Sequence, residues 1–229
     1  MAKKSFKRNS LEPIFSLLSE WRNSNIAPVD TMGCDALAEK KDLKIFRFQT
    51  LVALILSSQT KDQTVADAVR NLQKHDLSVD GVLNMDKDIL HECISKVGFH
   101  NRKLEYILQT CRIIVDEFDG DIPKDVNDLM KLPGVGPKMA YLTMQVAWNQ
   151  SVGIGVDTHV HRISNRIGWV KTRTPEQSRL ELQDWLPKSH WAKINHLLVG
   201  FGQLHCKPVK PSCHDCPVND YCQKNFKVK

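Results

Sequence analysis

Long apolar segments are missing from this 229-residue sequence. No apolar run reaches the ~18 residues that a membrane-spanning helix needs, which argues against a membrane protein. We also expect no signal peptide, because residues 1–9 are polar and an amphipathic pattern follows them. Internal repeats and low-complexity tracts are absent, and so is the sustained apolar–polar alternation that is typical of strands. The sequence therefore predicts an all-α globular protein, for which 41% hydrophobic and 25% charged residues are ordinary values.

Positive charge exceeds negative charge by a modest amount. The formal net charge is +6 and the isoelectric point is about 8.9, which favours a nucleic-acid partner over an acidic one only weakly. Four basic residues lie near the start of the chain: Lys3, Lys4, Lys7 and Arg8. They could form a nuclear-localisation signal or a DNA-contacting tail, although a merely solvated tail is at least as common.

Helical periodicity covers most of the chain. A first helix is expected over residues 10–22 with Ser10 as its cap, and the polar residues 23–44 are expected to form a connector. Residues 46–56 are apolar on nearly every side, which predicts a central, buried helix. Thr60 begins the capping-box pattern of the next helix. Further helices are predicted over residues 86–97, 104–118, 175–186 and 191–201.

A tight turn between two helical patterns stands at residues 132–138, Leu-Pro-Gly-Val-Gly-Pro-Lys. Gly134 and Gly136 permit positive φ and the close approach of another backbone, and Pro137 suits a first helical position. A helix that begins here would point free N–H groups and a partial positive charge outward, which suits a phosphate. Because no side chain in Gly-Val-Gly can read a base, such contact would not depend on the nucleic-acid sequence.

Two titratable residues follow this turn. Lys138 stands in the first turn of the second helix, where the helix dipole disfavours the protonated amine, and Asp157 opens another helical pattern. A lysine of lowered pKa beside a carboxylate can attack a sugar carbon and form a Schiff base. Taken singly, however, Lys138 is more simply a solvated lysine and Asp157 a helix N-cap.

Four of the seven cysteines are clustered, at positions 206, 213, 216 and 222. The other three are scattered and are expected to be buried thiols. Disulfides are improbable in a chain without a secretion signal and with three further lone cysteines. Four thiolates with a Cys-x2-Cys core suit a structural zinc ion or an iron–sulfur cluster, and the spacing alone favours zinc.

Several segments of the sequence occur in the order that is typical of one protein family. They are LSSQTKD (56–62), VGFHNRK (97–103), LPGVGPKMA (132–140), VDTHV (156–160), LLVGFGQ (197–203) and the cysteine run. Over roughly residues 10–225 the chain resembles the endonuclease III family of DNA glycosylases, and its eukaryotic branch more than its bacterial one.

The resemblance implies two helical domains with a DNA cleft between them. Residues 44–150 would form a six-helix domain that contains a helix–hairpin–helix motif, and residues 1–43 would join residues 151–229 in a discontinuous domain around an iron–sulfur cluster loop. Lys138 and Asp157 match the family's nucleophile and its catalytic aspartate, and would lie on opposite sides of the cleft. The family's cysteine run binds a [4Fe–4S] cluster, which reverses the preference for zinc and assigns its ligands as Cys206, Cys213, Cys216 and Cys222.

The implied activity is that of a bifunctional DNA glycosylase and AP lyase of base excision repair. Such a monomer would remove oxidised pyrimidines from double-stranded DNA and cut abasic sites by β-elimination, in the nucleus and also in the mitochondrion. The damaged nucleotide must be flipped out, and a side chain must fill the space that it leaves. By their positions in the family's motifs, Gln59 is assigned to fill this space and Phe99 to act as a wedge on the other strand. The residues alone instead favour a surface polar group for Gln59 and a core aromatic for Phe99. The predicted DNA-contacting set is Gln59, Phe99, His100, Leu132, Gly134, Gly136 and His159.

Two alternatives remain at this stage. A monofunctional mismatch adenine glycosylase has the same hairpin and cluster, but that branch lacks the nucleophilic lysine and carries an additional domain. A non-catalytic DNA-binding module would also bind backbone through the hairpin. The presence of Lys138 argues against the first alternative, and the pairing of Lys138 with Asp157 argues against the second.

Overall fold

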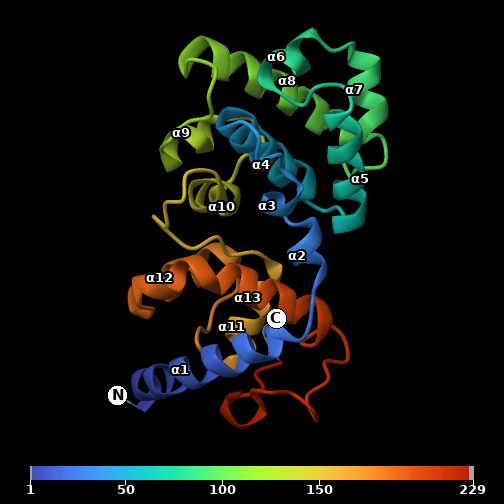
Figure 1. Cartoon of the computed structure of the whole chain (residues 1–229). Helices are drawn as coiled ribbons and strands as arrows, with labels where there is room; N and C mark the ends of the chain where they lie inside the picture. Colours follow the sequence, from blue (N-terminus) through green and yellow to red (C-terminus); the bar gives the residue numbers. More distant parts are fainter. Residues whose placement is uncertain (1, 227–229) are drawn as a thin grey trace. The chain divides into compact units, whose positions relative to one another are not determined.

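The computed structural model describes residues 2–226, with side chains from residue 10 onward. Every regular element in that range is a helix, which confirms the predicted all-α class. The chain divides into two compact units, one of Thr31–Val152 and one of Met1–Asp30 with Gly153–Lys229. Figure 1 labels the helices of both. No helix in the described range is long and apolar enough to cross a membrane. The basic side chains at positions 3, 4, 7 and 8 lie outside the described residues.

The unit of residues 31–152 is built around one buried helix, α4 (Leu43–Ser57). Asp42 caps this helix by accepting hydrogen bonds from the backbone N–H groups of Lys44 and Ile45. Every residue from Phe48 to Leu56 is buried, because other helices contact α4 on several sides. The remaining helices of this unit are α3 (Cys34–Leu37), α5 (Asp62–Gln73), α6 (Val79–Asn84), α7 (Lys87–Ile94), α8 (His100–Glu117), α9 (Val126–Lys131) and α10 (Pro137–Ala147).

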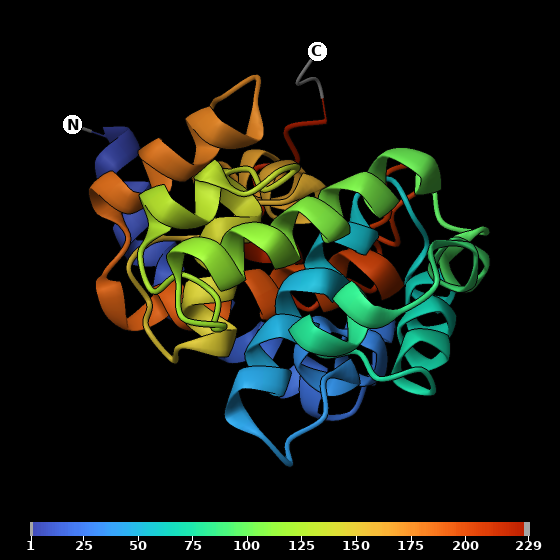
Figure 2. The same cartoon turned by 90° about the horizontal axis from the view of Figure 1, so that it is seen from above.

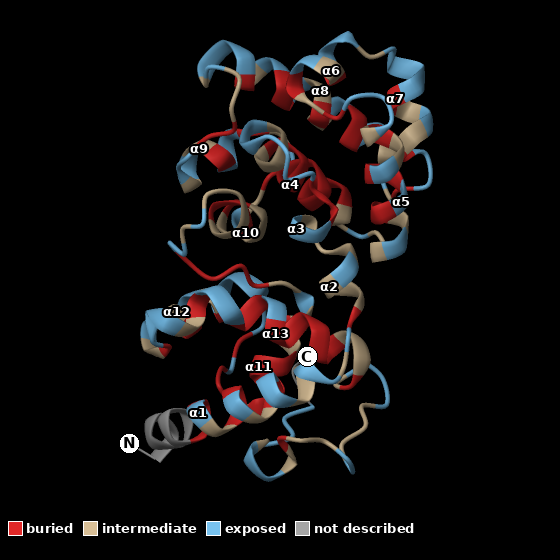
Figure 3. Cartoon of the chain, in the orientation of Figure 1, coloured by how far each residue is buried: buried red, intermediate tan, exposed pale blue. Residues whose placement is uncertain are grey.

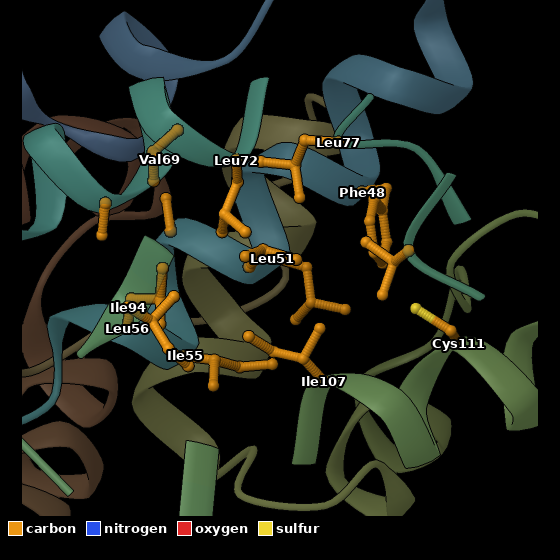
Figure 4. Packing of buried hydrophobic residues seen from close by; sticks show 14 of the residues in the cluster. Phe48, Leu51, Ile55, Leu56, Val69, Leu72, Leu77, Ile94, Ile107 and Cys111 are labelled. Carbon is orange, nitrogen blue, oxygen red and sulfur yellow. The ribbon is translucent and has the colours of Figure 1, made fainter. Parts of the chain in front are cut away.

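The predicted central helix is therefore confirmed. Figure 3 shows how much of α4 is buried, and Figure 4 shows Leu51 and Ile55 of this helix among apolar side chains from its neighbours, including Ile107 of α8. Helix α8 itself runs across one side of the unit and is seen along its length in Figure 2. Truncating a side chain such as Leu51, which is 0% exposed, would cost about 2–5 kcal/mol of stability because it leaves a cavity.

The second unit has its own apolar core, formed by α1 (Ala2–Asn23) and three helices from the end of the chain. These are α11 (Thr158–Ile167), α12 (Pro175–Trp185) and α13 (Trp191–Leu204), with short 3-10 turns η1 (Lys188–His190) and η2 (Asn219–Tyr221). Trp191, Ile194, Leu197, Leu198 and Phe201 are all buried, as their helical spacing predicted. Helix α13 contacts both α1 and α11 and so links the two ends of the chain.

Three local predictions differ from the structure. Ser10 is not a cap, because α1 begins at Ala2 and Ser10 lies inside the helix. The connector of residues 23–44 contains two short helices, α2 (Pro28–Met32) and α3, and α3 packs on α4 and α5. Because of that packing, residues 31–43 belong to the unit of α4, whereas the division implied by the family resemblance grouped them with the N-terminal helix.

Candidate functional site

The turn at residues 132–137 joins α9 to α10, as the sequence predicted. Asp125 caps α9, and the backbone N–H of Val135 donates to the carbonyl of Leu132 at 3.1 Å. Gly134 has a φ of +78°, and a Cβ at this position would collide with the ring of Tyr106 from α8. Glycine is therefore required here twice, by its backbone conformation and by the close approach of the tyrosine.

Gly136 lies at the N-terminus of α10 in a different environment. Its φ is −101°, an added Cβ would meet nothing within 4 Å, and Pro137 follows at the first helical position. The first helical hydrogen bond runs from the N–H of Ala140 to the carbonyl of Gly136, and no side chain caps the helix. The N–H groups of the first turn thus remain for a ligand, and the helix dipole favours an anion. Leu132 is 2% exposed, so only its main chain could take part.

Lys138 follows in the first turn of α10 and is half-buried. Its ammonium lies within electrostatic reach of Cys34, at the start of α3. Burial raises the pKa of the Cys34 thiol to about 12, and the charge of Lys138 acts in the opposite direction. A primary amine therefore stands directly beside the candidate phosphate site, which is the position that a nucleophile toward a DNA sugar requires.

Asp157 belongs to the other unit and is the N-cap of α11. Its Oδ1 accepts a hydrogen bond of 2.8 Å from the N–H of Val160, so the cap that the sequence suggested is present. The carboxylate also lies within electrostatic reach of the Arg162 guanidinium. Capping through Oδ1 leaves the second oxygen of the carboxylate a separate acceptor, so the structural and catalytic roles are compatible.

Gln59 and Phe99 stand on two loops of the unit that contains α4. Both are exposed, Phe99 by 61%, and both have left-handed backbone conformations, with φ of +51° and +58°. The exposure of Phe99 excludes the alternative of a core aromatic. His100 is half-buried, and its ring contacts that of His91 at a centroid distance of 5.1 Å. Its DNA contact stays a prediction.

The predicted capping box at Thr60 is wrong. Helix α5 has Lys61 as its N-cap, with no side-chain bond, because the Thr60 hydroxyl has other partners. It accepts the N–H of Gly98 at 3.2 Å and the ammonium of Lys103, also at 3.2 Å. Lys103 was not among the predicted site residues, although its spacing from the buried Ile107 places it on the apolar face of α8.

His159 lies on α11 with its side chain turned toward its own unit. Its Nδ1 is 3.2 Å from Nη2 of Arg162, and a Cβ added to Gly202 of α13 would lie 2.5 Å from the same nitrogen. These contacts support a packing role for the ring. The DNA contact assigned to His159 stays a prediction.

The cysteine segment, residues 206–222, is mostly irregular and follows α13. All seven cysteines are free thiols, and each of the four in this segment is half-buried. The pKa of Cys216 is raised to about 11, mainly by burial and in smaller part by the neighbouring thiols of Cys222, Cys206 and Cys213. The four sulfurs are therefore within electrostatic reach of one another.

Arginines from α11 hold this segment. Arg166 donates through Nη1 to the carbonyl of Lys207 at 2.7 Å and to Sγ of Cys206 at 3.4 Å, and through Nη2 to the carbonyl of Pro208 at 2.8 Å. Arg162 donates to the carbonyl of Cys206 at 2.9 Å. The N–H of Lys224 also points at a sulfur, that of Cys222, at 3.4 Å. Donors that point at sulfur stabilise thiolates and are typical surroundings of an iron–sulfur cluster.

The donor set of the segment suits an iron–sulfur cluster. It offers four free thiols, and N–H donors point at the sulfurs of Cys206 and Cys222. In the described part of the chain no three His, Cys, Asp or Glu side chains form a group that could hold a single metal ion. The residues present therefore fit a [4Fe–4S] group.

The chain matches two protein-family models. Residues 52–188 match the HhH-GPD superfamily of base excision DNA repair proteins, and residues 206–222 match the iron–sulfur binding domain of endonuclease III. The second match starts at Cys206 and ends at Cys222, and it identifies the cofactor as a [4Fe–4S] cluster.

Individual relatives agree with these matches. Endonuclease III homolog of Schizosaccharomyces pombe is 50% identical over 221 residues, which cover 94% of this chain and 62% of that protein. Endonuclease III-like protein 1 of Gallus gallus is 50% identical over 208 residues, which cover 90% and 74%. The chain thus spans 62% and 74% of the length of these two relatives.

The fold is similar to that of solved structures. A trapped endonuclease III–DNA covalent intermediate superimposes with a TM-score of 0.78 at 28% identity, covering 94% of this chain and 97% of the other. A thermostable thymine-DNA glycosylase, at 19% identity and a TM-score of 0.76, shares the fold. From its sequence, its helical architecture and its cysteine segment, the chain belongs to the endonuclease III family, within the HhH-GPD superfamily of base excision DNA repair proteins.

Proposed function

We propose that the protein is a bifunctional DNA glycosylase and AP lyase that removes oxidised pyrimidines from duplex DNA. The observation that carries the proposal is the half-buried Lys138 in the first turn of α10, at a helix N-terminus that no side chain caps. An anion site and an amine that share one helical turn suit attack on a sugar beside a bound phosphate. The relative solved as a covalent intermediate with DNA supports the same chemistry.

The reaction follows from what the chain's own groups can do. With the nucleotide flipped out, the Lys138 nitrogen bonds to C1′ of the sugar while the C1′–base bond breaks and the base leaves with a proton. The nitrogen gives up two protons in all: one leaves with the base, and the other passes to O4′ as the C1′–O4′ bond breaks. The opened sugar is then joined to Lys138 as an imine. Removal of a proton from C2′ breaks the C3′–O bond and cuts the strand. Asp157 stabilises the positive charge that develops on the sugar and moves protons.

The cysteine segment has a separate task in this proposal. Cys206, Cys213, Cys216 and Cys222 are the four thiolates that hold the cluster, which when bound fixes a segment with few buried apolar side chains. The partner is double-stranded DNA with an oxidised pyrimidine or an abasic site. The nuclear location, with mitochondrial sorting in addition, and the monomeric state stay predictions.

Reductive trapping tests the activity. Borohydride should reduce the imine and leave a stable adduct of the protein with a thymine-glycol duplex. Lys138→Gln should abolish both the adduct and strand cleavage while binding remains, because the amide cannot form a Schiff base. Lys87→Gln is the matched control, since it removes an exposed lysine of the same unit that pairs with Glu105.

Two further arms sharpen the experiment. Asp157→Asn should keep the nucleophile but slow base removal by roughly a hundredfold, the order expected for one acid–base or electrostatic group. If the wild-type protein releases the base and never gives an adduct, water is the nucleophile and the proposal of a lysine Schiff base is wrong. If it releases no base from any oxidised pyrimidine, the proposed substrate class is wrong.

A further inference from the structure

A buried lysine lies beneath the loop that carries Gln59. Lys103, on α8, is only 3% exposed. Its ammonium donates to the carbonyls of Leu56 and Ser58, at 2.8 and 2.6 Å, and to the Thr60 hydroxyl at 3.2 Å. The ammonium thus contacts the chain immediately before and immediately after Gln59.

The same cluster of bonds reaches the second loop. The Thr60 hydroxyl accepts the N–H of Gly98 at 3.2 Å and donates to the carbonyl of Ser58 at 3.1 Å. A Cβ added to Gly98 would lie 2.6 Å from the carbonyl oxygen of Gln59. The two loops therefore touch backbone to backbone, and one hydroxyl and one ammonium connect them.

Both loop tips have a backbone conformation that needs support. Gln59 and Phe99 are non-glycine residues with φ of +51° and +58°, a region that L-residues disfavour. Such conformations persist only where the surroundings fix them, and they gather at functional sites. The hydrogen bonds of Lys103 and Thr60 supply that constraint directly on either side of Gln59.

The chemistry of the cluster argues for more than core packing. Leu56 and Ser58 stand at the C-terminal end of α4, where the helix dipole favours a cation. The contacts recorded for the ammonium are nevertheless uncharged oxygens, and burial lowers the pKa of Lys103 to about 8. An apolar side chain would fill this place without the cost of burying a charge. The reason for a buried ammonium at this place is therefore that it holds three oxygen atoms of the loop together.

We propose that Lys103 is a positioning residue for lesion recognition, which fixes the loops of Gln59 and Phe99 as one rigid pair of tips that enters the duplex. The proposal rests on the proposed function, in which Gln59 fills the space left by the flipped nucleotide. It assigns Lys103 no contact with DNA, because the side chain is buried. Lys103 therefore affects base removal only by fixing the positions of Gln59 and Phe99.

Lys103→Met tests the proposal, since methionine keeps much of the volume and removes the donor. Base removal from a thymine-glycol duplex should fall by about tenfold to a hundredfold, the scale on which a misplaced positioning group acts. Cleavage of an abasic site in single-stranded DNA should stay unchanged, because no base stack has to be filled. A 2-aminopurine beside the lesion should show less unstacking on binding. Arg112→Met, an equal loss of charge on the exposed side of α8, is the control.

A double-mutant cycle with Gln59→Ala separates positioning from general destabilisation. If Lys103 acts through Gln59, adding Lys103→Met to Gln59→Ala should slow base removal much less than it slows the wild-type protein. Fully additive losses, or an equal loss on single-stranded abasic DNA, would overturn the proposal.

Thr60→Val provides a milder variant if Lys103→Met does not fold. It removes the hydroxyl that joins Gly98 to the ammonium, and it should lower unstacking and base removal in the same pattern. Normal unstacking by Thr60→Val together with a normal rate would also overturn the proposal. A wild-type protein that unstacks the duplex but forms no adduct would instead refute the Schiff-base chemistry and leave the positioning role intact.

Discussion

The hairpin turn at residues 132–137 and the cysteine segment at residues 206–222 are both irregular stretches next to a helix, yet they are held by different means. The hairpin is fixed by packing: Leu132 and Val135 are buried, and Tyr106 fills the space beside Gly134. In the cysteine segment Val218 is the one buried apolar residue, and arginines of α11 hold its carbonyls. The hairpin therefore owes its shape to the protein core, whereas the cysteine segment needs a cofactor to complete it.

Loss of one cysteine should have the largest effect. Cys213→Ser should lower the yield of soluble protein and remove the broad absorbance near ~400 nm that cysteine-ligated clusters give. Cys93→Ser, which changes a thiol outside the segment, should keep both. The measurements are iron and zinc content, the absorbance spectrum and thermal unfolding. A colourless wild-type protein with one zinc per chain would show that the assigned cofactor is wrong.

Alanine substitutions at the two hairpin glycines should differ in their effect on the stability of the protein. Gly134→Ala should destabilise the protein by about 1–2 kcal/mol or more, because alanine disfavours a φ of +78° and its methyl group meets Tyr106. Gly136→Ala should be close to neutral, because its φ of −101° is ordinary and the space beside it is open. Chemical denaturation of the two variants measures the difference. Equal losses would mean that the packing of Tyr106 does not shape the turn.

A charge at the second glycine should affect binding alone. Gly136→Asp should weaken the binding of all duplexes by roughly tenfold and reduce the dependence of affinity on salt, because it places a carboxylate at the expected phosphate position. Gly136→Asn, of the same shape and without the charge, is the control. Unchanged affinity in a folded Gly136→Asp protein would make the hairpin a structural turn only.

Local features of the site could be predicted from the sequence, and long-range ones could not. The cap by Asp157 and the start of α10 at Pro137 depend on residues within a few positions, so the pattern was sufficient. Ser10 and Thr60 have the right local spacing for caps, but a helix extends through the first and distant partners occupy the second. The role of Lys103 depends on contacts with residues more than forty positions earlier in the chain. No periodicity contains that information.

Helix α11 connects the cysteine segment with Asp157, the residue proposed for catalysis: the segment contacts its C-terminal end, and Asp157 caps its N-terminal end. The N–H of Gln223 donates to the carbonyl of Ile167 at 3.2 Å, and the N–H of Asn225 donates to the carbonyl of Arg166 at 3.0 Å. The chain that leaves Cys222 therefore covers the last carbonyls of the helix that Asp157 begins, and the helix is only about 15 Å long. If the segment opens, these two amides must exchange their hydrogens with solvent. Their exchange rates thus report how firmly the far end of the Asp157 helix is held.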